Sequence, residues 1–224
     1  MSKQTVAPFS DTYGLWIDGN ERSSGTDERL AVRNPATEGT LTEVTMGTAD
    51  DVNEAVAVAC EAYEPWQRCP PGERGRLLGD IAATIRDRKD RLARVETLEN
   101  GKPLTEARGQ VERAARHFEY YGGLADKIEG DSVPLSDAYV DYTIREPLGV
   151  TAHVVPWNVP IYLFARSVAP ALAAGNAAVV KPAEETPVGA LELARLATET
   201  GLPDGLLNVV PGFGDEAGAT LTGH

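Results

Sequence analysis

The sequence predicts an α/β fold: a parallel β-sheet with flanking helices, preceded by an N-terminal β-hairpin and a helical segment. Two observations lead to this prediction. In residues 148–224, short runs rich in β-branched residues alternate with longer runs of helical spacing, as is typical of βαβ units. In residues 1–136, strand-like patterns occur only near the beginning, and helical spacing follows. Residues 137–147 lie between these parts and predict a separate strand.

The N-terminal part begins with YGLWIDGNERSS and ERLAVRNPAT, which predict a strand, a turn and a second strand. Thr48-x-x-Asp51 then resembles a capping box at the start of a helix. Apolar residues from Val52 to Ala59 recur at helical spacing. We therefore expect the first helix to begin just after Thr48.

Further helices are expected after a loop at EPWQRCPPGE. Apolar residues at helical spacing predict one or two helices up to about Asn100. Gly101 ends this pattern, and Pro103 suits the first position of another helix that reaches about Tyr121. The stretch YVDYTIRE alternates in polarity and so predicts a half-exposed strand.

The pattern changes at Pro147. GVTAHVV predicts a buried strand, PIYLFARSVAPALAAG a helix that ends at Gly175, AAVV a strand, PVGALELARLATETG a helix and LLNVV another strand. Ligands of such sheets bind beyond the carboxyl ends of the parallel strands. We therefore expect one edge of the sheet to carry the turns Pro156-Trp157-Asn158, Lys181-Pro182-Ala183-Glu184 and Pro211-Gly212-Phe213-Gly214.

Each turn has two interpretations. Lys181 and Glu184 can offer a donor and an acceptor to a vicinal diol such as a ribose, or they can form a salt bridge at the sheet edge. The Asn158 amide can donate to a developing oxyanion, or it can hold the turn, which spacing alone favours. The glycines of the third turn do not match the G-x-G-x-x-G dinucleotide pattern, and tight turns need glycine in any case.

The composition argues against several kinds of partner. The net charge of −13 makes nucleic acid and anionic membranes unsuitable. No apolar run reaches the ~18 residues of a membrane span, and the N-terminus lacks a secretory apolar region, so we expect a cytoplasmic protein. Two cysteines and three scattered histidines predict neither a disulfide framework nor a metal site. The acid excess suits a high-salt cytoplasm, and equally an ordinary acidic protein.

In this order and spacing, VVPWNVP, AAVVKPAEETP and GLPDGLLNVVPGFGDEAG resemble the coenzyme-binding half of the aldehyde dehydrogenase superfamily. VRNPATEG, VETLENGKP and YTIREPLGV resemble segments of the same family, so the resemblance covers nearly the whole chain from about Tyr13. It implies a Rossmann-like coenzyme domain and an oligomerisation strand at 137–147. It also implies a homo-oligomeric enzyme that oxidises an aldehyde to a carboxylic acid with NAD, or NADP, as acceptor.

The resemblance assigns a role to each matching residue. Asn158 corresponds to the residue that stabilises the oxyanion of the thiohemiacetal, and Lys181 with Glu184 to the pair that holds the adenosine ribose. The Glu184 charge would repel a 2′-phosphate, which favours NAD, whereas Lys181 would tolerate one. The resemblance places Val154, Val155, Pro156 and Trp157 on the nicotinamide side, and Gly212, Phe213 and Gly214 near the adenine.

The helix after Asn158 is expected to face the aldehyde. Arg166 lies eight residues further on, slightly more than two helical turns, so both residues lie on roughly one face. The resemblance implies that this face lines the aldehyde tunnel, together with Val159, Tyr162 and Leu163. It also implies that an Arg at this position accompanies acid semialdehyde substrates. The alternative, which we favour slightly, is an ion pair between Arg166 and an acidic residue of this chain.

The chain also departs from the family pattern. The motif with the nucleophilic Cys and the Glu-Leu-Gly-Gly motif with the general base do not occur in it, so we expect a fragment without its catalytic domain, inactive alone. Cys60 and Cys69 are far in sequence from the predicted edge and unsuited to replace the nucleophile. A non-catalytic remnant that binds nucleotide or assembles with a fuller subunit is the alternative. A different Rossmann-type oxidoreductase is disfavoured by the missing glycine pattern.

Overall fold

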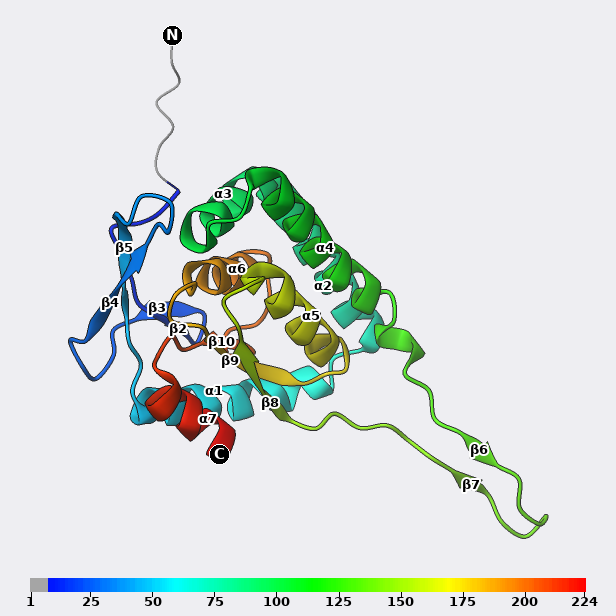
Figure 1. Ribbon diagram of the computed structural model, residues 1–224. Helices are drawn as coiled ribbons and strands as arrows, with labels where there is room; N and C mark the ends of the chain where they lie inside the picture. Colours follow the sequence, from blue (N-terminus) through cyan, green and yellow to red (C-terminus); the bar gives the residue numbers. More distant parts are fainter. Residues whose placement is uncertain (1–7) are drawn as a thin grey trace.

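The computed structural model describes residues 8–224, which Figure 1 shows. The N-terminal strands are β1 (Thr12–Tyr13), β2 (Leu15–Ile17), β3 (Asn20–Arg22), β4 (Arg29–Arg33) and β5 (Thr40–Thr45). They are followed by α1 (Ala49–Gln67), α2 (Pro71–Asp87), α3 (Lys89–Asn100), α4 (Leu104–Gly122), a 3₁₀ turn (Ala125–Lys127), β6 (Ser132–Val133) and β7 (Asp141–Tyr142). The C-terminal part comprises β8 (Val150–Val155), α5 (Pro160–Ala173), β9 (Ala177–Pro182), α6 (Val188–Glu199), β10 (Leu207–Val209), a π-helical turn (Gly214–Gly218) and α7 (Ala219–Gly223).

The main sheet has the strand order β3-β2-β10-β9-β8. Strands β8, β9 and β10 are parallel, and Val180 lies opposite both His153 and Val209. Helices α5 and α6 cover one face of this sheet and α1 covers the other (Figure 1). All six residues of β9 are buried, because strands flank it on both sides and helices cover it above and below. The predicted α/β fold with a parallel sheet and flanking helices is confirmed.

The N-terminal strands differ from the prediction. The first stretch forms a complete hairpin by itself, because Asp18 and Gly19 adopt positive φ angles of 56° and 67° and close a two-residue turn between β2 and β3. The second predicted strand, β4, instead pairs with β5, which the sequence analysis missed. Together with β1 these strands form a second, three-stranded sheet.

The first helix begins as expected and ends later than expected. The capping box is confirmed, since the Thr48 side chain accepts from the Asp51 backbone N–H and the Asp51 side chain accepts from the Thr48 N–H. The predicted loop after it is wrong, because α1 continues through Pro65 to Gln67 and α2 begins at Pro71. Trp66 explains the extension: it is buried, and its indole N–H donates to the carbonyl of Leu172 in α5 at 3.2 Å. Tertiary packing thus outweighs the helix-breaking tendency of proline.

The later helix boundaries agree closely with the pattern. Gly101 caps α3 with a left-handed φ of 87°, as expected of a residue that ends a helix. Pro103 is one position off the prediction, because it is the N-cap and Leu104 is the first helical residue of α4. Gly175, with a φ of 89°, lies just beyond the end of α5.

Two predicted strands are more exposed than their sequences indicated. β8 is an edge strand that pairs with β9, so Val155 is buried whereas Val154 is 57% exposed. In YVDYTIRE, strand structure is confined to Asp141–Tyr142, which pairs with β6 in a hairpin arm that projects from the body (Figure 1). Both faces of this arm are open, with Tyr139 71% and Val140 91% exposed. Alternation in sequence therefore does not mark a buried face here.

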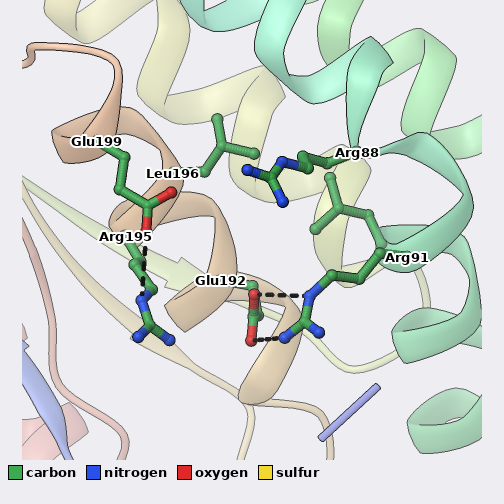
Figure 2. Close-up of a pocket in the computed structure, with 7 residues that line it drawn as sticks. Arg88, Arg91, Glu192, Arg195, Leu196 and Glu199 are labelled. Carbon is green, nitrogen blue, oxygen red and sulfur yellow. Dashed lines mark hydrogen bonds and ion pairs between the residues drawn. The ribbon is translucent and has the colours of Figure 1, made fainter. Parts of the chain in front are cut away.

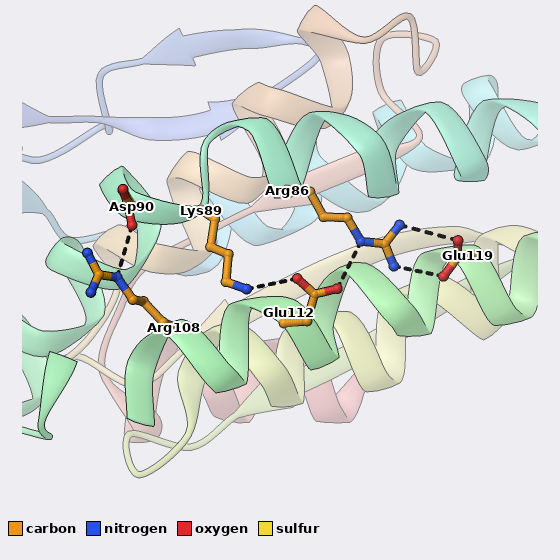
Figure 3. A network of polar contacts seen from close by, with 6 residues as sticks. All are labelled: Arg86, Lys89, Asp90, Arg108, Glu112 and Glu119. Atoms are coloured by element: carbon orange, nitrogen blue, oxygen red, sulfur yellow. Dashed lines mark hydrogen bonds and ion pairs between the residues drawn. The ribbon is translucent and has the colours of Figure 1, made fainter. Parts of the chain in front are cut away.

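Helices α2, α3 and α4 form an outer layer over α5 and α6 (Figure 1). Charged side chains bridge the facing surfaces of this layer (Figure 3). Arg86 contacts Glu112 at 2.9 Å and Glu119 at 2.7 Å, and Lys89 contacts Glu112 at 2.9 Å. Hydrogen bonds from Lys89 and Arg86 lower the pKa of the Glu112 carboxyl. Such partly exposed pairs contribute little individually, so the layer must depend mainly on its apolar contacts.

The closest approach of α2 and α4 occurs at two glycines. A Cβ atom on Gly75 would lie 2.4 Å from the carbonyl oxygen of Gly122, and one on Gly122 would lie 2.8 Å from the carbonyl oxygen of Gly75. Both obstacles are backbone atoms, so the two helices would have to separate to admit a side chain. Gly79, one turn further along α2, has open space around its Cβ position.

We therefore expect Gly75→Ala and Gly79→Ala to have opposite effects on stability. Forced separation of packed helices costs about 1–3 kcal/mol, whereas alanine at an open helical position gains up to about 1 kcal/mol. The measurement is the Tm of each variant. An equal or higher Tm for Gly75→Ala would show that the close contact of the two helices does not constrain the layer.

Candidate functional site

The three turns singled out by the sequence lie at the carboxyl ends of β8, β9 and β10, which are adjacent parallel strands. Lys181 is 4% exposed, and its ammonium group donates to the carbonyl of Pro182 at 2.9 Å and to Glu184 at 3.3 Å. The Lys181 stem reaches the π-helical turn that continues the third turn, because a Cβ on Gly218 would lie 3.3 Å from its Cε atom. The second and third turns therefore form one continuous surface with a Lys–Glu pair on it.

The third turn requires glycine at its second position. A Cβ atom on Gly212 would lie 2.5 Å from the Cβ of Ala217 and 2.9 Å from the carbonyl oxygen of Gly47. Gly214 has open space around it, and Phe213 is half-buried. Within this turn the sequence alone did not distinguish the glycine that packing requires from the one that it does not.

The first turn exposes the side chains of Trp157 and Asn158. Of the two valines before it, Val154 faces outward and Val155 is 3% exposed in the core. Within residues 8–224, the Asn158 side-chain amide has no hydrogen-bond partner. It is therefore free to donate to a ligand placed beyond the edge of the sheet.

The turn is held by residues that sequence reasoning did not select. The side-chain amide of Asn100 donates to the carbonyl of Trp157 at 2.6 Å, and the ammonium of Lys102 donates to the carbonyl of Asn158 at 3.1 Å. Lys102 also pairs with the fully buried Glu96 at 2.6 Å. All three residues lie in the stretch VETLENGKP, which the sequence analysis used only as part of the family resemblance. The contact with the turn becomes visible only in the fold.

The same stretch fixes the start of α6. The carboxylate of Glu99 accepts from the backbone N–H groups of Val188 and Gly189, both at 3.0 Å. Glu99 is 3% exposed. Burial raises the pKa of its carboxyl to about 8, against the opposing effect of the two N–H donors.

Beside Glu99 is a cleft of about 520 Å³, lined by β4 residues and by Asn100, Trp157, Glu184, Glu185 and Thr186. The hydroxyl of Thr186 is buried there without a partner in the described part of the chain.

The first two turns of α5 carry the other candidate residues. Val159, Tyr162 and Leu163 are half-buried, and Arg166 is exposed. The ring of His117, on α4, lies 5.1 Å from that of Tyr162 between centroids. Burial, and then the charge of Arg166, lower the pKa of His117. Arg166 makes no ion pair within residues 8–224, so the alternative of an intramolecular pair has no support in this structure.

Neither cysteine belongs to one of these three turns. Cys60 is exposed on α1, and Cys69 is half-buried in the link to α2. Burial and the nearby Glu73 raise the pKa of the Cys69 thiol, which is the opposite of what a nucleophile needs. Residues 8–224 contain no His/Cys/Asp/Glu cluster suited to a metal ion. No helix in that range is long and apolar enough to cross a membrane.

A second cleft, of about 210 Å³, lies between the start of α3 and the C-terminal half of α6 (Figure 2). Its arginines are largely neutralised. Arg91 contacts Glu192 at 2.7 Å, and Arg195 contacts Glu199 at 3.5 Å. Glu192 also accepts from the hydroxyl of Tyr13 at 3.0 Å. We interpret this cleft as a polar network that ties α6 to α3 and to the N-terminal strands.

Comparison with known proteins identifies the family. The model of the aldehyde dehydrogenase family matches residues 22–224. The chain belongs to the aldehyde dehydrogenase family. It is 44% identical to aminoaldehyde dehydrogenase 2 of Zea mays and 43% identical to betaine aldehyde dehydrogenase 1 of Oryza sativa, with 94% of this chain and 44% of each relative covered. The chain thus spans less than half the length of these relatives.

Solved aldehyde dehydrogenase structures share the fold. PnpE of Pseudomonas sp. WBC-3, solved with nicotinamide adenine dinucleotide, superposes with a TM-score of 0.93 at 41% identity, over 95% of this chain and 44% of PnpE. The NAD⁺ complex of the Bacillus cereus aldehyde dehydrogenase gives a TM-score of 0.93 at 37% identity, with the same coverage. The expected resemblance to the family is confirmed, and the coverage of 44% is consistent with an N-terminal part of a family member.

We expect Glu99 to make stability decrease as the pH rises. Its folded-state pKa of about 8 lies above the ordinary value of 4.5, so the folded protein retains a proton that the unfolded chain releases. The contribution is complete below the lower value and is lost as the pH rises through the upper one. Glu99→Gln should flatten the decline, which is measured as the urea midpoint at several pH values between the two. Glu61→Gln, at an exposed position of α1, is the control and should leave the slope unchanged. Equal slopes in wild type and Glu99→Gln would contradict this assignment.

Proposed function

We propose that this chain is the coenzyme-binding half of an enzyme that oxidises an aldehyde to a carboxylic acid with NAD as acceptor. The observation that carries the proposal is the Asn158 amide. It lies exposed and unpartnered on the same sheet edge as the Lys181–Glu184 pair. Family membership and the NAD complexes of two relatives support the choice of coenzyme.

The residues at the edge fit a dinucleotide. Glu184 is one-third exposed, so its carboxylate can accept from a ribose diol while Lys181 donates from beneath. Gly214 allows close approach near the adenine, beside Phe213, and Gly212 lets the turn pack closely enough to present them. Val154, Pro156 and Trp157 offer outward surface for the nicotinamide, to which Val155 would contribute backbone only. When bound, NAD accepts the hydride of the substrate. The Glu184 charge disfavours the extra phosphate of NADP.

Asn158 has the role of oxyanion donor in this proposal. A neutral amide that needs no rearrangement stabilises charge that develops on the substrate oxygen. In this proposal no residue of 8–224 serves as the nucleophilic thiol or the general base. Residues 137–147, in the exposed arm, would serve subunit assembly. Residues 1–136 and 148–224 together would form the coenzyme domain. The cytoplasmic location and the high-salt habitat remain predictions.

The full-length enzyme tests this role. Asn158→Ala should lower kcat by about 10²–10³-fold, the usual effect of removing one oxyanion donor, with little change in NAD affinity. Steady-state kinetics and NAD titration measure the two quantities. Absence of NAD-dependent aldehyde oxidation in the wild type would refute the function. A large loss of NAD affinity with kcat preserved would make Asn158 a turn residue instead.

Arg166 leads to a proposal about the substrate. It is exposed, has no intramolecular ion pair in the described residues, and follows Val159, Tyr162 and Leu163 along the proposed tunnel. A guanidinium in such a place can hold a carboxylate through two parallel hydrogen bonds. We therefore expect a higher kcat/KM for succinate semialdehyde than for butanal.

Arg166→Ala in the full-length enzyme should remove most of this preference. The comparison of kcat/KM for both aldehydes, before and after the substitution, is the measurement. If the substitution reduces both values alike, or if the wild type prefers butanal, Arg166 has no part in recognising a carboxylate.

A further inference from the structure

The Pro156–Pro160 turn cannot hold its own shape by hydrogen bonds. Its two prolines have no backbone N–H, so few donors remain within it. Its carbonyls at Trp157 and Asn158 point to side chains more than fifty residues earlier in the chain. That earlier segment supplies side-chain hydrogen bonds to the two carbonyls on either side of the Asn158 Cα.

The segment provides three hydrogen bonds from one ammonium group. The ammonium of Lys102 donates three hydrogen bonds, to Glu96, to Gln110 and to the carbonyl of Asn158. The side chain of Lys102 is 7% exposed and that of Glu96 is 0% exposed, so water has little access to this ion pair, whereas the bond to the Asn158 carbonyl lies at the surface. An ammonium group has three protons, and each has an acceptor here. A buried ammonium that loses its partner destabilises the fold strongly, because its charge is then uncompensated. The Lys102 side chain is therefore expected to occupy one position.

Asn100 supports the same turn from the other side of Gly101. Its amide donates to the carbonyl of Trp157 at 2.6 Å and lies 3.4 Å from that of Asn158. The left-handed Gly101, with a φ of 87°, reverses the chain between the two residues. This reversal lets Lys102 return to Glu96 in the last turns of α3 while Asn100 and Lys102 grip adjacent carbonyls. Asn100 and Lys102 together are called the clasp below.

We propose that the clasp positions the Asn158 amide for catalysis, acting through the backbone of the turn. The proposal rests on the oxyanion role proposed above for Asn158. Neither clasp residue needs to touch the substrate: each fixes a peptide carbonyl next to the Asn158 Cα, and so fixes where the side chain begins. A displacement of the order of 1 Å at a reacting centre costs about 10²-fold in rate. Loss of the clasp should accordingly affect kcat much more than coenzyme affinity.

The main test uses the full-length enzyme with Lys102→Met, which keeps the length of the side chain and removes its charge. We expect kcat to fall by about 10–100-fold, with the Kd for NAD unchanged within about threefold. Lys89→Met is the matched control, because Lys89 forms a salt bridge with Glu112 on the outer layer, away from the turn. It should leave both values unchanged.

A double-mutant cycle with Asn158→Ala separates positioning from general damage. If Lys102 acts through Asn158, Lys102→Met should cost little further rate once the amide is gone, because coupled residues are non-additive. If Lys102→Met lowers kcat by the same factor in both backgrounds, the clasp merely supports the fold and the proposal is overturned. Asn100→Asp gives a second route should Lys102→Met fail to fold. It keeps the shape, replaces the N–H donor by a carboxylate, and should show the same kcat loss and the same non-additivity.

A further measurement does not depend on activity. Amide hydrogen exchange in the peptide that spans residues 157–164 should be faster in Lys102→Met than in Lys89→Met, with exchange in β9 unchanged. If the wild type oxidises no aldehyde, the proposed function fails, while this comparison still tests the clasp. Unchanged exchange in 157–164 would show that the turn holds itself and would overturn the clasp.

Discussion

The burial of ionisable side chains at the end of α3 is the constraint on which the ligand edge depends. Glu96, Glu99 and Lys102 are removed from water, so each must find partners inside the protein. Glu99 finds them in the first N–H groups of α6, and Lys102 in Glu96, Gln110 and the turn before α5. One short segment therefore fixes where both helices of the βαβ unit begin. Since ligands of parallel sheets bind at these beginnings, the outer helical layer takes part in shaping the site.

Close packing of small residues makes this arrangement possible. The glycine pair of α2 and α4 brings the outer layer together, and Gly189 at the start of α6 leaves only 2.9 Å between its Cβ position and Ile161. Alanines on α5 allow that helix to pack against both the sheet and α4. Short distances between layers then let the Glu99 carboxylate reach across to α6. A bulkier layer would leave the same carboxylate buried without donors.

In the hairpin arm, by contrast, large apolar side chains are exposed to solvent. Val140, Ile144 and Leu148 are between 67% and 91% exposed, in a protein that elsewhere buries its large aliphatic side chains well. Exposed apolar surface of this extent is typical of regions that other protein surfaces cover. Exposed apolar surface of this kind is what the proposed role of residues 137–147 in subunit assembly requires.

The sequence by itself determined the order of the elements and the positions of the three turns. Periodicity, caps and glycines act over a few residues, so the Thr48 capping box, the Gly101 cap and the alternation after residue 148 were readable directly. Parallel pairing then follows from the alternation, which is why Lys181, Glu184 and Asn158 were expected on one edge. Local rules failed where distant contacts compete with them. Pro65 lies inside a helix because Trp66 is buried against α5, and β4 pairs with β5 rather than with the first hairpin.

Only the tertiary structure decided which residues support the site. Asn100 and Lys102 lie more than fifty residues before the turn that they hold, and no periodic pattern connects them to it. Glu99 looked like any acidic residue near a helix end until the fold placed it at the start of α6. Tertiary structure also decided that Val154 is exposed and Val155 is buried, because β8 is an edge strand and one of its faces is open to solvent. The local sequence thus determines which side chains lie at the carboxyl edge of the sheet. The hydrogen bonds that hold the first turn of this edge join segments that only folding brings together.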